Sequence, residues 1–262
     1  MIKVMLLCQF MIDSHCHIDS CKNDDAVDPS LNAMVTIGTS LERSINSLKI
    51  AKEHKNVWLA VGIHPNNASD AKDKDIRQGI EQLATNELVV GIGETGFDNY
   101  WDDETFETQI EAFRWQAELA KKLDKALILH IRDKQGKEDA SLLAMQMIKE
   151  SGLSRGILHC FNGHKGLLEL GLEQNWMISF AGNVTYKKAT ELHEAAKIVP
   201  KTNLMVETDS PYLAPVPKRG KRNTPGYVRH TAAFLAKLRG ESLEELESYT
   251  DANAIKIYKL PI

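Results

Sequence analysis

The sequence predicts an α/β protein whose strands close into a (β/α)8 TIM barrel. Three observations support this class. Eight short apolar runs recur along the 262 residues, most of them are followed by a segment with helical spacing, and no linker-like stretch interrupts the alternation. Alternating strands and helices form a parallel sheet buried on both faces, and eight such units make one barrel.

The expected strands are the apolar runs themselves. They are short and rich in Val, Ile, Leu and Met, which is typical of strands that are covered on both faces. In chain order they occupy residues 11–13, 33–38, 56–62, 87–93, 125–130, 155–159, 175–180 and 203–207.

Amphipathic segments between these runs are the expected helices, because their apolar residues lie three and four positions apart. The clearest are 40–54, 103–123, 137–151 and 187–199, and the chain from Asn223 onward, including 242–260, is also expected to be helical. The first crossover is the exception. Only residues 20–32, with Pro29 among them, separate the first two strands, so the first β–α crossover is expected to be shortened, with its helix very short or missing.

The bulk composition argues against several classes of protein. A net charge of −4 does not suit a protein that coats nucleic acid, and no apolar run is long enough to span a membrane. The four cysteines form no CxxC pair, so we expect free thiols and a cytoplasmic location. The sequence leaves the oligomeric state open, with a monomer as the working expectation.

The start of the folded domain is expected at Met11. Residues 1–10 precede the first expected strand, and no small-residue cleavage site of the kind that ends a signal peptide follows them. We therefore expect residues 1–10 to be an N-terminal leader or extension and residues 11–262 to form a single TIM-barrel domain.

Residues with metal-binding or catalytic chemistry follow six of the expected strands. In chain order they are His15, His17, His64, Glu94, His130, His159 and Asp209. The carboxyl ends of all strands in a barrel lie on one face, so these side chains are expected to meet there. Because residues two apart on a strand share a side, His15 and His17 should point into the site together, with Cys16 on the opposite side.

Six of these seven residues are the expected metal ligands: His15, His17, Glu94, His130, His159 and Asp209. A lone histidine at a strand end usually has a structural role, but so many imidazoles and carboxylates in one place carry a large desolvation cost unless a cation binds them. Six ligands exceed the four of one tetrahedral ion, which indicates two divalent ions bridged by a carboxylate, with Glu94 as the expected bridge. The donor types suit Mg²⁺, Mn²⁺ or Zn²⁺.

Six motifs are specific enough to indicate a family. They are DSHCHID (13–19), GIHP (62–65), GIGETGFDNY (91–100), LILHIRD (127–133), ILHCFNG (157–163) and VETDSPYLAPVPKRGKRNTP (206–225). Together they closely resemble the TatD-type metal-dependent deoxyribonucleases of the amidohydrolase superfamily, from Met11 essentially to the C-terminus. The short segment 20–32 departs from the family, which usually has a full helix there, and residues 1–10 have no counterpart.

The resemblance also implies how the ligands divide between the two ions. It implies that His15, His17, Glu94 and Asp209 hold one ion. It implies that Glu94, His130 and His159 hold the second. All six residues that the strand positions indicate are therefore also ligands by resemblance.

The expected activity is hydrolysis of phosphodiester bonds by a water molecule that two metal ions activate. Glu94 and Asp209 are the expected catalytic residues, with Asp209 either accepting the proton of that water or serving as a ligand alone. The resemblance implies that the substrate is DNA and that the enzyme is a 3′–5′ exonuclease. The expected DNA is single-stranded or has free 3′ ends.

Two other functions stay open. The first is an ester or amide hydrolase that uses the same centre, for example a D-aminoacyl-tRNA deacylase with tRNA as its partner, because a two-metal centre also suits attack on a carbonyl carbon. The second is a metal-binding scaffold without turnover.

Four residues are expected to bind the substrate. Lys221 and Arg222 belong to the basic run 218–222, which follows the last strand and is therefore expected beside the metal site. Basic residues near a cleft contribute the sequence-independent part of nucleic-acid affinity. His64 shares the strand-end position of the ligands and is also assigned to the substrate.

Arg132 is the fourth, because it follows His130 by two residues and is expected on the same side of its strand. It can bind a phosphate through two hydrogen bonds. A salt bridge to Glu207 or Asp133 is the structural alternative. Aromatic residues expected near the same face, and therefore candidates for stacking on unpaired bases, are Tyr100, Trp101, Phe161 and Tyr212.

Overall fold

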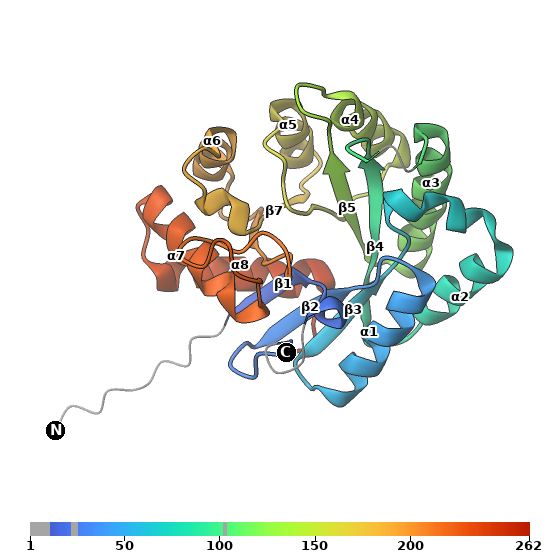
Figure 1. Ribbon diagram of the computed structural model, residues 1–262, viewed down its shortest axis with the longest axis horizontal. Helices are drawn as coiled ribbons and strands as arrows, with labels where there is room; N and C mark the ends of the chain where they lie inside the picture. The colour runs from blue at the N-terminus through green and yellow to red at the C-terminus, as the bar shows by residue number, and fades with distance from the viewer. Residues whose placement is uncertain (1–10, 22–25, 102–103) are drawn as a thin grey trace.

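The structure, a computed structural model, describes residues 11–21, 26–101 and 104–262. Within these residues one sheet of eight parallel strands runs in the order β1 to β8, with helices around it (Figure 1). The strands are β1 (Ile12–Cys16), β2 (Ala33–Ile37), β3 (Val57–Val61), β4 (Val89–Asp98), β5 (Ala126–Arg132), β6 (Gly156–Leu158), β7 (Met177–Phe180) and β8 (Leu204–Val206). Each overlaps one expected strand, and the TIM-barrel class is confirmed.

The helices are α1 (Leu41–Glu53), α2 (Lys74–Ala84), α3 (Phe106–Leu123), α4 (Asp139–Ser151), α5 (Lys165–Glu173), α6 (Thr190–Ile198), α7 (Val228–Arg239) and α8 (Leu243–Tyr258). Short 3₁₀ helices are η1 (Ile18–Ser20), η3 (Pro65–Lys72), η4 (Gly182–Thr185) and η5 (Pro225–Tyr227). Of the described residues between β1 and β2, only η1 is helical, so the shortened first crossover is confirmed. The leader or extension expected at 1–10 lies outside the described residues.

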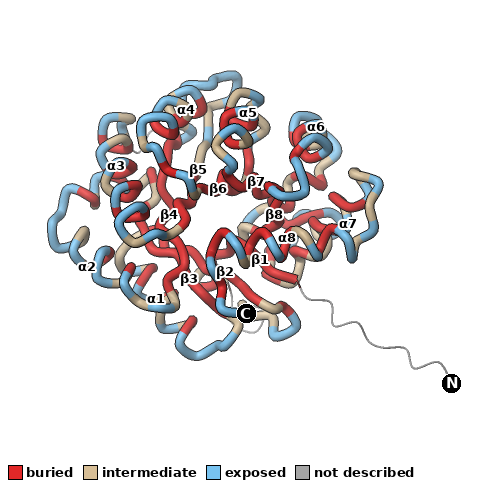
Figure 2. Tube along the Cα trace, turned by 180° about the vertical axis from the view of Figure 1, so that it is seen from behind, coloured by how far each residue is buried: buried red, intermediate tan, exposed pale blue. Residues whose placement is uncertain are grey.

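Two apolar clusters build the core. The larger one lies between the strands and the surrounding helices, and the smaller one contains side chains such as Val35, Trp58 and Ile128 from the strands together with Ile257 and Tyr258 of α8. Figure 2 shows buried residues concentrated in the strands and on one side of the surrounding helices. The Tyr258 hydroxyl donates a hydrogen bond to the Ser14 carbonyl oxygen (3.0 Å). Helix α8 therefore packs against the interior of the sheet.

The segment after β8 is joined to β1 by backbone hydrogen bonds. The Asp209 N–H donates to the His15 carbonyl oxygen (2.9 Å), and the His17 N–H donates to the Ser210 carbonyl oxygen (2.7 Å). The buried Asp13 carboxylate also accepts from the backbone N–H (2.8 Å) and hydroxyl (2.6 Å) of Thr208. Expected metal ligands and their sequence neighbours therefore make the hydrogen bonds that join β1 to the segment after β8.

Bulges interrupt β1 and β4 close to the expected ligands. In β4 the pairing passes from Ile92 opposite Leu127 to Thr95 opposite Leu129, so Gly93 and Glu94 together face a single residue of β5. A bulge re-aims a side chain relative to the regular alternation. Gly93 has φ of 135°, and a Cβ there would lie 2.6 Å from the Ile128 carbonyl oxygen, so only glycine fits beside Glu94.

The bulge in β1 has the same consequence for His15. The pairing passes from Asp13 opposite Met34 to Cys16 opposite Thr36, so two residues of β1 face one of β2. His15 and His17 both reach the site, while Cys16 belongs to the outer apolar cluster. The expected separation of Cys16 from the two histidines is confirmed.

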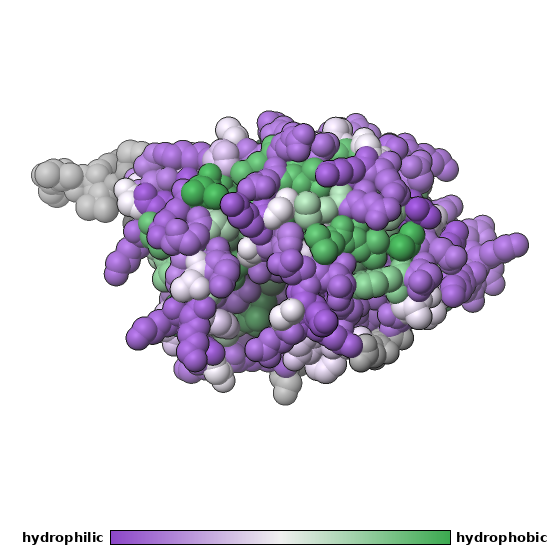
Figure 3. All heavy atoms as spheres, turned by 90° about the horizontal axis from the view of Figure 1, so that it is seen from above, coloured by the Kyte–Doolittle hydropathy of each residue, from purple (hydrophilic) through white to green (hydrophobic). Residues whose placement is uncertain are grey.

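The surface seen in Figure 3 is mainly hydrophilic, with smaller hydrophobic areas between the hydrophilic residues. Within the described part of the chain, none of the helices combines the length and apolar character needed to cross a membrane. The described cysteines Cys16, Cys21 and Cys160 are free thiols.

Asp251 of α8 joins this helix to β1 through a buried carboxyl group. It is 8% exposed and accepts a hydrogen bond from the Ile12 N–H (2.9 Å). Burial raises its pKa to about 7. An aspartate in the unfolded chain releases its proton near pH 4, so the folded state binds this proton more tightly and its contribution to stability is lost as the pH rises from about 4 to about 7.

We predict that Asp251→Asn reduces the loss of stability with rising pH, because the amide oxygen can still accept from Ile12 but carries no charge. The contribution to be removed is on the order of 2 to 4 kcal/mol, at about 1.4 kcal/mol per pH unit. Thermal and urea unfolding between pH 5 and pH 8 measure it. Glu111→Gln, at an exposed position of α3, is the control. An equal pH dependence in both variants would contradict the prediction.

Candidate metal centre

A cavity of about 1190 Å³ lies at the carboxyl ends of the strands. The sequence-predicted residues that line it are His17, His64, Glu94, Arg132, His130, His159 and Asp209. His15 is 1% exposed and lies among the same ligand groups. Lys221 and Arg222 do not line this cavity. Residues from six separate parts of the chain thus converge as the strand positions predict.

The first group of donor atoms joins β1 to the segment after β8. Nε2 of His15 lies 3.5 Å from Oε2 of Glu94 and 3.7 Å from Oδ1 of Asp209. Nε2 of His17 lies 3.6 Å and 3.3 Å from the same two oxygens. Four donors bound tetrahedrally at about 2.1 Å from an ion lie about 3.4 Å from one another. The spacing of this group therefore fits one metal ion.

Buried atoms without partners support this assignment. Nε2 of His15 and Oε2 of Glu94 are fully buried and have no hydrogen-bond partner. Buried polar atoms in proteins are normally hydrogen-bonded, because an unpaired one keeps its full desolvation cost. A cation at this position would satisfy both atoms.

The second group uses the other oxygen of the same carboxylate. Oε1 of Glu94 lies 2.9 Å from Nδ1 of His130 and 3.0 Å from Nε2 of His159. The two histidine nitrogens are 3.4 Å apart. Three protein donors leave further coordination positions for water or substrate, which is typical of a catalytic ion. Glu94 therefore has one oxygen in each group, as a bridging ligand requires.

Hydrogen bonds on the outer side of three histidines orient their rings. Nδ1 of His17 donates to the Ile37 carbonyl oxygen (3.2 Å), Nε2 of His130 to Oδ2 of Asp98 (3.0 Å), and Nδ1 of His159 to Oε1 of Glu207 (3.0 Å). A neutral imidazole that donates through one nitrogen presents a lone pair at the other. In the neutral form, all three rings therefore present an unprotonated nitrogen to the donor groups, as metal ligands must.

His64 has the opposite arrangement. Its Nδ1 accepts a hydrogen bond from the Asn66 backbone N–H (3.1 Å) at the start of η3, so in the neutral ring the proton is on Nε2. That nitrogen lies 3.7 Å from Oε1 of Glu94. Burial and the neighbouring His130 lower the pKa of His64 to about 3, which keeps the ring neutral. His64 is close enough to Glu94 and His130 to share an ion with them, but in this tautomer the nitrogen that faces them carries a proton and can donate a hydrogen bond.

Electrostatics keep the bridging residue charged. Glu94 is 3% exposed, and burial by itself raises the pKa of a carboxylate. The neighbouring imidazoles of His159, His130 and His15 nevertheless hold the pKa of Glu94 well below its ordinary value. An ionised, buried carboxylate is the form that coordinates a metal.

Asp98 and Glu207 were not assigned to the site from the sequence. Asp98 ends β4 and orients His130, while Glu207 orients His159 and also accepts from the Cys160 N–H (2.8 Å). The sequence did contain a signal for both residues, because each lies close to an expected carboxylate ligand. Asp98 follows Glu94 by four residues, and Glu207 precedes Asp209 by two. Strand β4 continues to Asp98, whereas the expected strand ended at residue 93.

Arg132 contacts aromatic rings rather than the carboxylates considered from the sequence. Its guanidinium carbon lies 3.8 Å from the centre of the Tyr100 ring and 5.7 Å from that of Trp101. Glu207 is hydrogen-bonded to His159, and Asp133 accepts from the N–H groups of Ala140 (2.8 Å) and Ser141 (3.3 Å) at the start of α4.

The expectation that Phe161 lies on the rim is wrong. This residue is 3% exposed, and its ring packs edge-on against Phe180 with 6.0 Å between ring centres. The residue turns into the core because the chain bends directly after His159, where Cys160 has a positive φ of 41°. Tyr212 lines the cavity and is 54% exposed.

Lys221 and Arg222 lie on the segment that follows β8, outside the cavity. Both side chains are exposed, and the Arg222 guanidinium donates to the Ser20 carbonyl oxygen. Tyr212 and Leu213 of the same segment do line the cavity. The basic run 218–222 therefore follows closely in sequence the two residues that form part of the cavity wall.

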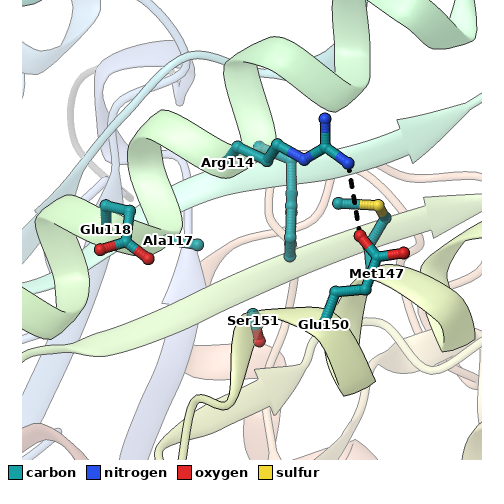
Figure 4. A pocket seen from close by; sticks show the side chains of 7 residues that line it. Arg114, Ala117, Glu118, Met147, Glu150 and Ser151 are labelled. Atoms are coloured by element: carbon teal, nitrogen blue, oxygen red, sulfur yellow. Dashed lines mark hydrogen bonds and ion pairs between the residues drawn. The ribbon is translucent and has the colours of Figure 1, made fainter.

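A second, smaller cavity lacks such chemistry. Its volume is about 240 Å³, and it lies between α3 and α4, where Arg114 and Glu150 form an ion pair of 3.3 Å (Figure 4). Its lining contains no histidine or cysteine. Of these two cavities, only the one at the strand ends brings imidazoles together with carboxylates.

Comparison with known proteins gives consistent relatives. The family model described as TatD related DNase matches residues 12–259. The chain is 35% identical to the "Uncharacterized metal-dependent hydrolase YcfH" of Escherichia coli K12, with 96% of each chain covered. It is 36% identical to the "3'-5' ssDNA/RNA exonuclease TatD" of a Rahnella species, with 88% of each covered.

A solved structure agrees with the fold and the sequence. The crystal structure of YJJV, a TatD homolog from Escherichia coli K12, superposes with a TM-score of 0.85 at 26% identity. The superposition covers 97% of this chain and 99% of that one. The similarity therefore includes the whole barrel.

We predict that Glu94→Gln and His64→Asn have different effects on metal binding. Glu94→Gln removes the charge shared by both donor groups, so affinity should fall by more than the roughly 10- to 100-fold typical of changing a residue that only orients a ligand. His64→Asn keeps a side-chain acceptor for the Asn66 N–H and should leave the metal content unchanged. Elemental analysis after dialysis and titration with Mn²⁺ measure both. Loss of metal in His64→Asn would make His64 a ligand.

Proposed function

This chain belongs to the TatD-related DNase family of metal-dependent hydrolases, and from that premise we propose that it hydrolyses phosphodiester bonds in nucleic acid with two divalent ions bound at the centre. The observation that carries the proposal is the position of Glu94. Its two carboxylate oxygens face separate groups of imidazole and carboxylate donors. Paired ions joined by one carboxylate are typical of enzymes that displace groups at phosphorus.

Bound divalent ions supply Lewis acidity, which offsets the charge that develops on phosphate oxygens and makes water a better nucleophile. The protein's own residues then position the substrate and move the proton. The Asp209 carboxylate is 14% exposed in the cavity, and we assign it to accept the proton of the attacking water. The Nε2–H of His64 donates a hydrogen bond to a phosphate oxygen of the substrate.

The substrate we propose is DNA with a single-stranded or free 3′ end. The Rahnella relative is named a 3'-5' ssDNA/RNA exonuclease, and we extend that direction of cleavage to this chain. The basic run 218–222 supplies positive charge next to one wall of the cavity. The free thiols of the described cysteines fit a reducing compartment, and we propose a cytoplasmic, monomeric enzyme.

We predict that the purified protein, freed of metal and then supplied with Mg²⁺, Mn²⁺ or Zn²⁺, releases mononucleotides from a 5′-labelled single-stranded DNA. Ladders that shorten from the 3′ end support the proposed polarity, and Glu94→Gln should abolish the reaction. Charged D-aminoacyl-tRNA is assayed in parallel. Release of the amino acid without cleavage of DNA would replace the nuclease with an ester hydrolase, and no turnover of either substrate would leave a metal-binding scaffold.

We predict that Lys221→Ala combined with Arg222→Ala weakens binding of single-stranded DNA and makes it less dependent on salt. Each lost phosphate contact should reduce the slope of log affinity against log salt by about 0.7. Fluorescence anisotropy at several salt concentrations measures this, and the metal content should not change. Lys121→Ala with Lys122→Ala, at the far end of α3, is the matched control. An unchanged slope would exclude the basic run from DNA binding.

A further inference from the structure

We infer that Tyr100, Trp101 and Arg132 form a platform that binds a nucleobase of the substrate beside the metal centre. The inference rests on the proposed function, because it concerns the same site and the same class of substrate. It assigns to these three residues the recognition of an unpaired base, which explains how a nuclease of this kind selects single-stranded ends.

The three side chains are already stacked together. The Arg132 guanidinium lies over the Tyr100 ring (3.8 Å) and near Trp101 (5.7 Å). The two aromatic rings meet edge-to-face, with 4.7 Å between their centres and 81° between their planes. Planar groups held by such contacts lose little freedom when another planar group stacks on them.

The platform is exposed although it is rich in aromatic surface. Tyr100 is 42% exposed and Trp101 is 51% exposed. Tryptophan is highly buried on average in folded proteins, and exposed apolar groups that cluster usually mark a binding surface. Trp101 and Arg132 both line the cavity that contains the metal-binding residues. The exposed Trp101 ring therefore lies at the cavity that a substrate must enter, and the Tyr100 ring contacts it from the side.

The charge of Arg132 is available to a ligand. Among the described residues, no carboxylate forms an ion pair with it, since Glu207 and Asp133 are hydrogen-bonded elsewhere. Arginine stacks through its face and donates hydrogen bonds through its edge. With the face on Tyr100, the edge can bind a phosphate oxygen while the rings bind the base of the same or the neighbouring nucleotide.

The distance from the metal donors suits an adjacent nucleotide. Arg132 pairs with Asp98 across β4 and β5 and follows His130 by two residues. Two residues along a strand advance about 7 Å. The platform therefore lies about 7 Å from the second donor group along β5, toward the carboxyl end of the strand.

A nucleobase is the ligand that matches this chemistry. Stacking on aromatic rings is tolerant of base identity, because every base has a π face, and it requires a base that is not paired in a duplex. The adjacent guanidinium edge matches the phosphate that accompanies each base. An amino acid ester would satisfy only part of this surface.

The test compares single-stranded DNA with the same oligonucleotide lacking the base at one of the last three positions at its 3′ end. In the wild type, the best-placed abasic site should reduce kcat/KM by about 10- to 100-fold, the range that one stacked base contributes. Trp101→Ala and Tyr100→Ala should slow cleavage of the intact substrate by a similar factor and cleave the abasic one no more slowly than the wild type does. Trp101→Phe should restore most of the difference.

A second measurement does not depend on turnover. A base stacked on an exposed indole quenches its fluorescence, so addition of single-stranded DNA to the metal-free protein should quench the wild type. The quenching should persist in Trp115→Phe, whose indole is bonded to Glu81 on the outer surface, and be lost in Trp101→Phe. Lack of quenching in the wild type would overturn the platform.

The outcomes separate the inference from the proposed function. If the wild type cleaves intact and abasic substrates equally well, the protein is a nuclease and the platform is wrong. If it neither cleaves nor binds DNA, both statements fall. If Trp101→Ala reduces cleavage of the abasic substrate as much as cleavage of the intact one, the aromatic residues support the fold of the rim instead of binding a base.

Discussion

The buried carboxylate of Glu94 is the constraint around which the rest of this structure is arranged. It is 3% exposed and lies within 2.9 to 3.7 Å of nitrogens from five histidines. A buried charge of this kind is tolerated only when oppositely charged or hydrogen-bonding groups surround it. The imidazoles hold it ionised, and its two oxygens divide the surrounding donors into two groups.

The barrel departs from regular geometry where this arrangement requires it. Bulges in β1 and β4 turn His15 and Glu94 toward the cavity, and Gly93 provides the close approach to β5 that a side chain would block. Backbone hydrogen bonds from Asp209 and His17 attach the last segment to β1. Helix α8 contributes Ile257 and Tyr258 to the smaller apolar cluster, together with side chains of the strands.

The histidines differ in their roles because the ring nitrogen that faces away from the donor groups has a different hydrogen-bond partner in each case. His17, His130 and His159 donate outward and present lone pairs to a metal, whereas His64 accepts from the backbone and presents a proton. The sequence places all of them at strand ends but contains no information on which nitrogen carries the proton. That choice decides whether the nitrogen that faces the cavity can coordinate an ion or donate a hydrogen bond.

Hydrophobic periodicity and strand ends are local properties of the chain. The barrel, the short first crossover and the convergence of six residues could therefore be predicted from the sequence: His15, His17, Glu94, His130, His159 and Asp209. The bulges were missed, and β4 runs to Asp98 because its pairing with β5 resumes beyond Gly93. Tertiary contacts set the hydrogen-bond partners of the histidines, the position of the proton on His64, the burial of Phe161 and the stacking of Arg132 on Tyr100. These features depend on contacts between segments that are distant in sequence, or on the direction in which the chain turns. No local sequence pattern encodes such contacts or turn directions.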